Sequence, residues 1–300
     1  MLWLRLLRSL LFGLEVIVIM EWKWEDIVEA IKDVVKKVKE DYLIDNEVLR
    51  DYTFEILEKH CVVLYYPLEG EKSNGFHTKK IVKDELKDFV YINTAKPVEL
   101  QVFTAAHELG HVWNVAKKVW DALGYKDTLE EEMEESITNR FAAELLMPEA
   151  AFIKMFYQKK DEMGLEGNTI TADDLLRISV GLMNVFLVQY DAVRKRLFET
   201  KIINDAGRAL LKKNDSEYKE KVQIYAKEQN SLLEKASFNK TIPGIRELIE
   251  EAEKKASLNE LSLKKIKEDF GIQNVKAEKE MLEIQVGGET NGETESTGRC

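Results

Sequence analysis

Apolar residues recur at helical spacing along most of the chain. Between residues 22 and 58 they predict two helices, separated by a break around Asp45 and Asn46. From residue 200 to 285 they predict further, highly charged helices, with breaks near Asn214, Pro243 and Gly271. The helices predicted between these two regions cover residues 98–122, 129–146 and 149–160, a segment that starts at Thr171 in a capping-box-like sequence, and a segment that starts at Gln189.

β-Branched and aromatic residues gather in three short segments that predict strands. These segments are residues 61–68, 79–84 and 88–95. Residues 69–77 contain two glycines and predict a loop before the second strand. A few short strands among many helices predict an α+β fold that is mainly helical and contains a small β-sheet.

The first twenty residues are dense in leucine, isoleucine and valine, but Arg5, Arg8 and Glu15 interrupt them. A spanning helix needs about 20 predominantly apolar residues, and no small-residue cleavage site of a secretory signal follows the run. An amphipathic helix begins directly after Met20. We therefore favour translation that starts at Met20, with a membrane-associating N-terminal helix as the alternative.

Charge and cysteine content narrow the class of protein. The chain has 44 Lys and Arg against 55 Asp and Glu, a net charge of −11. This surface does not suit nucleic acid or anionic lipid, and a basic protein partner would suit it better. Two distant cysteines, Cys61 and Cys300, exclude a disulfide framework and indicate a reducing compartment, which we take to be the cytoplasm.

Two of the four histidines fall in the sequence His107-Glu108-Leu109-Gly110-His111. Residues four apart on a helix share one face, so both imidazoles can reach a single Zn²⁺. Glu108 then lies beside the open metal position, where a carboxylate can take a proton from water. A chance match on an ordinary helix is the competing explanation, and the scarcity of histidine argues against it. His60 and His77 have no partner at ligand spacing and are expected to be structural or loop residues.

A catalytic zinc site needs a third protein ligand. No later histidine exists, so a carboxylate must serve, and five glutamates crowd the start of the next helix. Glu135 shares a stripe with Asn139 and Ala143 that becomes small and apolar, as suits a ligand. The other explanation is that this acidic run is a solvated first turn favoured by the helix dipole, which we expect for Glu130, Glu131 and Glu132.

Three segments resemble the ImmA/IrrE-type zinc metallopeptidases. VFTAAHELGHVW resembles the zinc-binding helix of that family, residues 135–148 resemble its E-x-x-A-N-x-F-A-A-E-L-L-M-P segment, and residues 88–95 resemble the strand before the helix. Thr138 replaces the usual alanine, and Ile137 leaves no ligand two residues before Asn139. The matching ligand is therefore Glu135. The resemblance covers residues 25–200 and weakens after 171, where Gln189 replaces the usual serine.

The resemblance implies a zincin-like metallopeptidase that cuts a helix-turn-helix repressor and so relieves repression in mobile-element or stress regulation. Zn²⁺ would be held by His107, His111 and Glu135, with Glu108 as catalytic base and later as proton donor to the leaving amine. We expect the strand at 89–93 to pair with an extended substrate segment. Asn139 is expected to orient Glu135 or to bond backbone.

Two other functions remain open. One is a zinc-containing interaction module that binds and occludes a repressor without cutting it, although a structural site has no use for Glu108. The other is a DNA-reading helix-turn-helix in residues 174–197, whose basic cluster is limited to Arg194, Lys195 and Arg196. We expect no direct binding of nucleic acid.

Five regions result from this reading. They are an apolar N-terminal segment (1–20), a zincin-like metallopeptidase domain (21–160), a helical segment of the family region (161–200), a charged helical region of unknown role (201–285) and a disordered tail (286–300).

Overall fold

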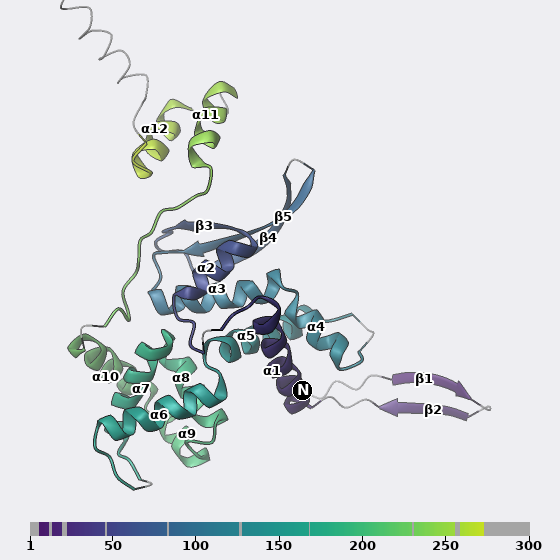
Figure 1. The fold of residues 1–300 in the computed structure, drawn as a ribbon, viewed down its shortest axis with the longest axis vertical. Coiled ribbons are helices and arrows are strands. Elements are labelled where there is room, and N and C mark those ends of the chain that lie inside the picture. The colour runs from purple at the N-terminus through teal and green to yellow at the C-terminus, as the bar shows by residue number, and fades with distance from the viewer. Residues whose placement is uncertain are drawn as a thin grey trace, which may run out of the picture. The chain divides into compact units, whose positions relative to one another are not determined.

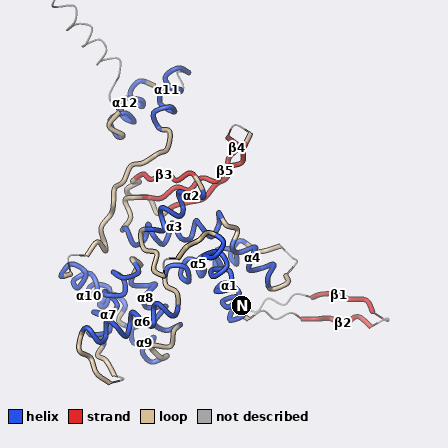
Figure 2. Tube along the Cα trace, in the orientation of Figure 1, coloured by secondary structure: helices blue, strands red, loops and turns tan. Residues whose placement is uncertain are grey.

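A computed structural model gives the structure of the chain (Figure 1). It describes residues 6–11, 14–19, 23–45, 47–82, 84–125, 128–167, 169–229, 231–255 and 259–272. Helices dominate, and a three-stranded sheet and a separate pair of antiparallel strands accompany them (Figure 2), which confirms the predicted mainly helical α+β class. The chain forms two compact units, Met1–Asn239 and Lys240–Cys300. The five predicted regions stay a prediction, and the tail at 286–300 lies outside the described residues.

The N-terminal segment contains two strands rather than a helix. β1 (Leu6–Leu11) and β2 (Leu14–Ile19) pair antiparallel, with Leu6 opposite Ile19. The alternative of an N-terminal helix is therefore wrong for these residues. The β-branched run from Val16 to Ile19 favours the extended form.

The two helices predicted before residue 60 are confirmed, and the first supplies part of the core. α1 (Trp24–Asp41) and α2 (Tyr52–His60) lie on either side of the expected break. α1 buries one face, which contacts α4 and α5. The buried residues of that face are Ile27, Ile31, Val34, Val35 and Val38.

The sheet has the strand order β3-β5-β4. β5 (Glu85–Asn93) runs parallel to β3 (Val62–Tyr66) and antiparallel to β4 (Gly75–Val82). Since β5 has a neighbour on both sides, the expectation that residues 89–93 pair with a substrate is wrong. In the described part of the chain β4 is an edge of this sheet, and its outer side can accept a further strand.

β4 begins earlier than the sequence predicts, so His77 lies in a strand and not in a loop. Gly75 was interpreted as part of a loop. Its lack of a side chain instead allows β4 to lie close to β5 and to the helix that follows β5. A Cβ added to Gly75 would lie 2.5 Å from the Tyr91 carbonyl oxygen and 2.6 Å from Thr104 Cγ2. Pairing with β5 and packing on the next helix therefore decide the conformation here.

The helix predicted for residues 98–122 is broken in two. α3 (Val98–Val112) ends at Trp113, and α4 (Val115–Ala122) begins after Asn114, whose φ of 51° is left-handed. Asparagine tolerates this conformation better than most residues, and Trp113 is buried at the corner. α5 (Glu131–Leu146) packs along α3, and α6 (Glu149–Glu162) starts after Pro148, as predicted.

Helices complete both units. In the first, α7 (Ala172–Phe186), α8 (Tyr190–Glu199), α9 (Asp205–Lys213) and α10 (Asp215–Glu228) follow in order. Thr171 caps α7, because its Oγ1 accepts a hydrogen bond of 3.1 Å from the Asp174 amide. The second unit contains α11 (Ile245–Lys255) and α12 (Glu260–Asp269).

A helix that crosses a membrane needs about 20 predominantly apolar residues in succession. No single one of the described helices is long and apolar enough to cross a membrane. α7 and α8 meet those criteria only as a pair, and the pair is bent by 105°.

Candidate metal site

α3 presents two imidazoles on one face and buries most of the rest of its surface. His107 and His111 lie one helical turn apart, and their Nε2 atoms are 3.1 Å from each other. Val102, Ala106 and Leu109 are fully buried and fix the helix in the core. The predicted histidine pair therefore stands on a rigid element, with both rings directed to one point.

Gly110 allows α5 to approach this helix closely. A Cβ at Gly110 would lie 2.7 Å from Thr138 Cγ2 and 3.2 Å from Phe141 Cδ1, both side chains of α5. Because no Cβ is present, the two helices pack tightly enough for a carboxylate of α5 to reach the histidines. This close approach explains why a glycine is tolerated inside α3.

Glu135 is the carboxylate that the structure brings to the histidine pair. Its Oε2 lies 3.4 Å from His107 Nε2, and its Oε1 lies 3.2 Å from His111 Nε2. One ligand atom from each of the three residues falls within 4.8 Å of the others. Tetrahedral zinc with bonds of about 2.1 Å holds its ligand atoms about 3.4 Å apart. The three side chains therefore fit a zinc ion that retains an open fourth position.

Two further residues of α5 lie beside the imidazoles. Asn139 Oδ1 lies 3.1 Å from His107 Nδ1 and accepts its proton. Glu134 Oε1 lies 3.5 Å from Nδ1 of His111. Because the amide oxygen of Asn139 can only accept, its bond places the proton of His107 on Nδ1 and leaves the Nε2 lone pair of that ring free for a metal. Asn139 thus orients His107, and the expectation that it orients Glu135 or bonds backbone was wrong.

Glu108 lies in the buried part of the site and is only 5% exposed. Burial, followed by the charge of Glu135, raises the pKa of the Glu108 carboxyl to about 7. Burial also lowers the pKa of His107, and the neighbouring His111 contributes in the same direction. A neutral imidazole is the form that binds a metal, and a carboxyl with a pKa near neutrality is suited to accept and return a proton.

The two remaining histidines have different surroundings. His60 packs against Tyr42 and Trp113 in an aromatic cluster, as expected of a structural residue. His77 instead lies beside the site, because its ring is stacked with that of His111 at a centroid distance of 6.2 Å. Its Nε2 is 2.6 Å from Asp88 Oδ1. The positions of His77 and Asp88 in the sequence do not predict that they lie near α3, because only the pairing of β4 with β5 brings them there.

Asn93, at the end of β5, joins the loop between β3 and β4 to the turn before α3. Its Oδ1 accepts hydrogen bonds from the Leu68 and Ala95 amides, and its Nδ2 donates to the carbonyls of Leu68 and Ser73. The residue is fully buried. Asn93 therefore fixes the end of the sheet relative to the loop after β3 and to the start of α3, the helix that carries both histidines.

The comparison with protein-family models agrees with a metallopeptidase-type domain. Residues 58–198 match the model of the IrrE N-terminal-like domain, a peptidase family. A solved structure, a Mycobacterium tuberculosis transcriptional regulator, is similar at 14% identity and a TM-score of 0.37, over 58% of this chain and 51% of the other. This chain thus spans about half the length of that protein. The comparison with curated proteins finds no match.

Proposed function

We propose that the metallopeptidase-type domain of this chain, whose residues 58–198 match the model of the IrrE N-terminal-like peptidase domain, is a zinc-dependent endopeptidase. The observation that carries this proposal is the convergence of His107, His111 and Glu135 within 4.8 Å. Imidazole and carboxylate ligands in this number suit zinc with an open position. A purely structural zinc site would be closed by a fourth protein ligand.

Zinc, when bound, supplies Lewis acidity that polarises the scissile carbonyl and makes water more acidic. Glu108 accepts the proton of the attacking water and then donates it to the leaving amine. Asn139 holds His107 in the tautomer that leaves its Nε2 directed at the site, and the Glu134 carboxylate lies near Nδ1 of His111. Each of these roles falls to a residue of α3 or α5.

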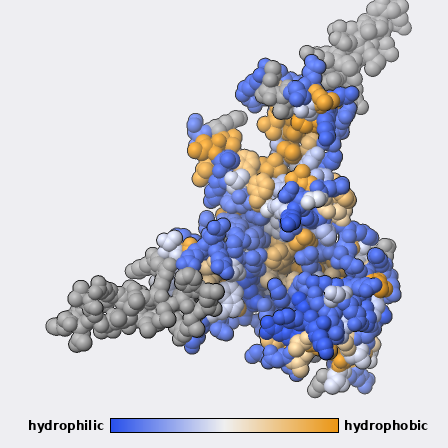
Figure 3. All heavy atoms as spheres, turned by 180° about the vertical axis from the view of Figure 1, so that it is seen from behind, coloured by the Kyte–Doolittle hydropathy of each residue, from blue (hydrophilic) through white to orange (hydrophobic). Residues whose placement is uncertain are grey.

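The outer side of β4 is the surface that supports binding of an extended substrate. β4 is a sheet edge in the described part of the chain, and its His77 ring stacks with His111. Phe76, Ile81 and Leu86 of the β4–β5 hairpin are exposed apolar side chains, and an orange patch covers part of this hairpin in Figure 3. A substrate strand can bond to the backbone of β4 and cover this apolar surface.

The proposed substrate is a helix-turn-helix transcriptional repressor, whose cleavage would relieve repression in the cytoplasm. Two arguments support it: the resemblance of the three motif segments, and the net charge of −11, which attracts a basic DNA-binding protein. The competing function is binding and occlusion of the repressor without cleavage.

The test mixes the full-length protein with a helix-turn-helix repressor encoded beside its gene. Intact mass and operator occupancy of the repressor are followed with the wild type and with Glu108→Gln. We expect the wild type to shorten the repressor and Glu108→Gln to be slower by about 10²–10⁴-fold, because water loses its proton acceptor. If both proteins relieve repression equally and neither shortens the repressor, the occluding function replaces the peptidase.

A further inference from the structure

A pocket of about 350 Å³ lies beside the metal site candidate. Phe103 forms part of its wall and stands one turn before His107 on α3. Asn139 and Ala143 form the opposite part and follow Glu135 along α5 in steps of four residues. The pocket therefore continues the same helix–helix groove, one turn away from the three candidate ligands.

The pocket has an apolar part and a charged wall. Phe103, Ala143 and Met147 supply the apolar part. The wall formed by α8 contains four charged side chains, Asp191, Lys195, Arg196 and Glu199. Which charges are free to attract a ligand depends on the ion pairs that these side chains already make.

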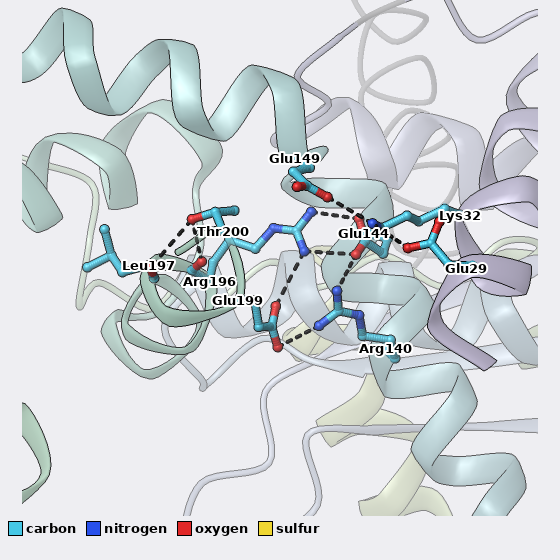
Figure 4. A network of polar contacts seen from close by, with 9 residues as sticks. All are labelled: Glu29, Lys32, Arg140, Glu144, Glu149, Arg196, Leu197, Glu199 and Thr200. Carbon is cyan, nitrogen blue, oxygen red and sulfur yellow. Dashed lines mark hydrogen bonds and ion pairs between the residues drawn. The ribbon is translucent and has the colours of Figure 1, made fainter. Parts of the chain in front are cut away.

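Three of the four are already paired. The guanidinium of Arg196 donates to both carboxylate oxygens of Glu144 at 2.6 and 2.8 Å, and Glu199 lies between Arg196 and Arg140 (Figure 4). Asp191 lies 3.0 Å from both Arg194 and Lys219. The two carboxylates of the wall are thus compensated by guanidinium and ammonium groups of the protein itself.

Lys195 differs from these residues. It is exposed, and it makes no ion pair with any described residue. The Nδ2 group of Asn139 is a further donor at the pocket, since its contact with His107 uses only Oδ1. In a chain with a net charge of −11, this pocket therefore offers a cation and an amide donor beside an apolar surface.

We propose that this pocket binds the side chain of a glutamate or aspartate of the substrate, with Lys195 as the residue that sets this specificity. The stem of the side chain packs on Phe103 and Met147, and its carboxylate pairs with the Lys195 ammonium. A basic side chain would be repelled by the Lys195 ammonium, and an apolar one would gain no ion pair from it.

The position of the pocket locates this residue in the substrate. One helical turn is about 5.4 Å, which corresponds to about two residues of an extended chain. The acidic residue therefore lies one or two positions from the scissile bond. This inference rests on the proposed peptidase function, but binding of a peptide can be measured without cleavage.

The experiment uses zinc-loaded, full-length protein that carries Glu108→Gln, so that bound peptides stay intact. The immobilised protein is incubated with an equimolar library of N-acetylated, C-amidated octapeptides, and the retained peptides are sequenced. Blocked ends remove the terminal carboxylate as a source of negative charge. We expect Asp and Glu to be enriched about two- to fivefold at one position, the effect of a single screened ion pair.

Charge reversal then tests the residue. Adding Lys195→Glu should abolish this enrichment and favour Lys and Arg at the same position, whereas Lys118→Glu, a matched change on α4 that does not line the pocket, should preserve it. The inference is overturned if no acidic enrichment occurs, or if it persists in Lys195→Glu. Failure of the peptidase function is seen separately, as wild-type protein that does not shorten the repressor.

Discussion

At the scale of single residues, the ring nitrogens of the two histidines matter most. Histidine has two ring nitrogens that can bind a metal. A hydrogen-bond acceptor beside one nitrogen keeps the proton there and leaves the other nitrogen free for the metal. Here Asn139 and Glu134 lie at the Nδ1 atoms, which leaves Nε2 of both rings facing Glu135. The spacing of His107 and His111 predicts the pair, but not these neighbours, which depend on how α5 crosses α3.

Glu135 and Glu131 provide a matched comparison of two carboxylates on α5. Glu135→Gln removes the carboxylate that lies 3.2 Å from His111 Nε2, whereas Glu131→Gln changes a residue of the exposed first turn. We expect zinc affinity to fall at least about tenfold in the first variant and to stay unchanged in the second. Competition with a chromogenic chelator measures both affinities. Equal values would mean that the third ligand is another residue.

Glu108 predicts how the stability of the metal-free protein depends on pH. Its folded-state pKa is raised from 4.5 to about 7, so the folded protein binds this proton more tightly than the unfolded chain does. Wild-type stability should therefore fall as pH rises through this interval and level off above it. Glu108→Gln lacks this term, so it should gain on the wild type by up to about 3 kcal/mol at pH 8 and by little at pH 4.5.

Urea denaturation of chelator-treated wild type and Glu108→Gln at several pH values measures this difference. A constant difference between pH 4.5 and 8 would contradict the burial of an ionisable Glu108. Excess zinc is the control, because its positive charge beside the carboxylate should reduce the pH dependence.

At the scale of helices and strands, local pattern predicted most elements. Periodic apolar residues were sufficient to predict α1 and α5, and the Thr171 cap was sufficient to predict the start of α7. The break at Asn114 and the early start of β4 were not predictable, because Trp113 is buried among α2 and α5 residues and Gly75 lies against Tyr91 and Thr104. Contacts between distant segments overrode local preference in both places.

Gly110→Ala tests the close packing of α3 on α5. The added Cβ would meet Thr138 and Phe141, which are both fully buried and have little room to move. We expect a loss of about 1–3 kcal/mol in the free energy of unfolding, from urea denaturation, together with weaker zinc binding as Glu135 moves away.

Gly181→Ala on α7 is the control for that change. Its Cβ would meet only the flexible side chain of Lys159, at 3.0 Å. Replacing a helical glycine by alanine gains up to about 1 kcal/mol where space allows, so this variant should be neutral or more stable. If Gly110→Ala behaves in the same way, close approach of the two helices is not what requires a glycine.

At the scale of the whole molecule, a segment far along the chain secures the helix that carries the histidines. The Val98 amide donates to the Lys235 carbonyl at 2.9 Å, and the buried Glu99 carboxylate accepts the Glu234 amide at 3.1 Å. Burial raises the pKa of Glu99. No local pattern around residue 235 indicates this contact, so the sequence alone placed these residues in a separate charged region.

The buried pair of Arg196 and Glu144 is a second long-range feature that the sequence did not reveal. The two residues are 2% and 3% exposed and join α8 to α5 (Figure 4). Charged residues are seldom buried to this extent unless they are paired. The motif around Glu144 indicated a helix next to the site, but only the fold shows that Glu144 pairs with the guanidinium of Arg196.

The central claim is that one zinc ion is held by the two histidines of α3 and the carboxylate of Glu135. It is tested most directly by zinc content, measured by mass spectrometry of the metal in purified full-length protein. We expect about one zinc ion per chain in the wild type and none retained in the double variant His107→Ala, His111→Ala, since a lone carboxylate cannot hold the ion. Full zinc occupancy in the folded double variant would contradict it.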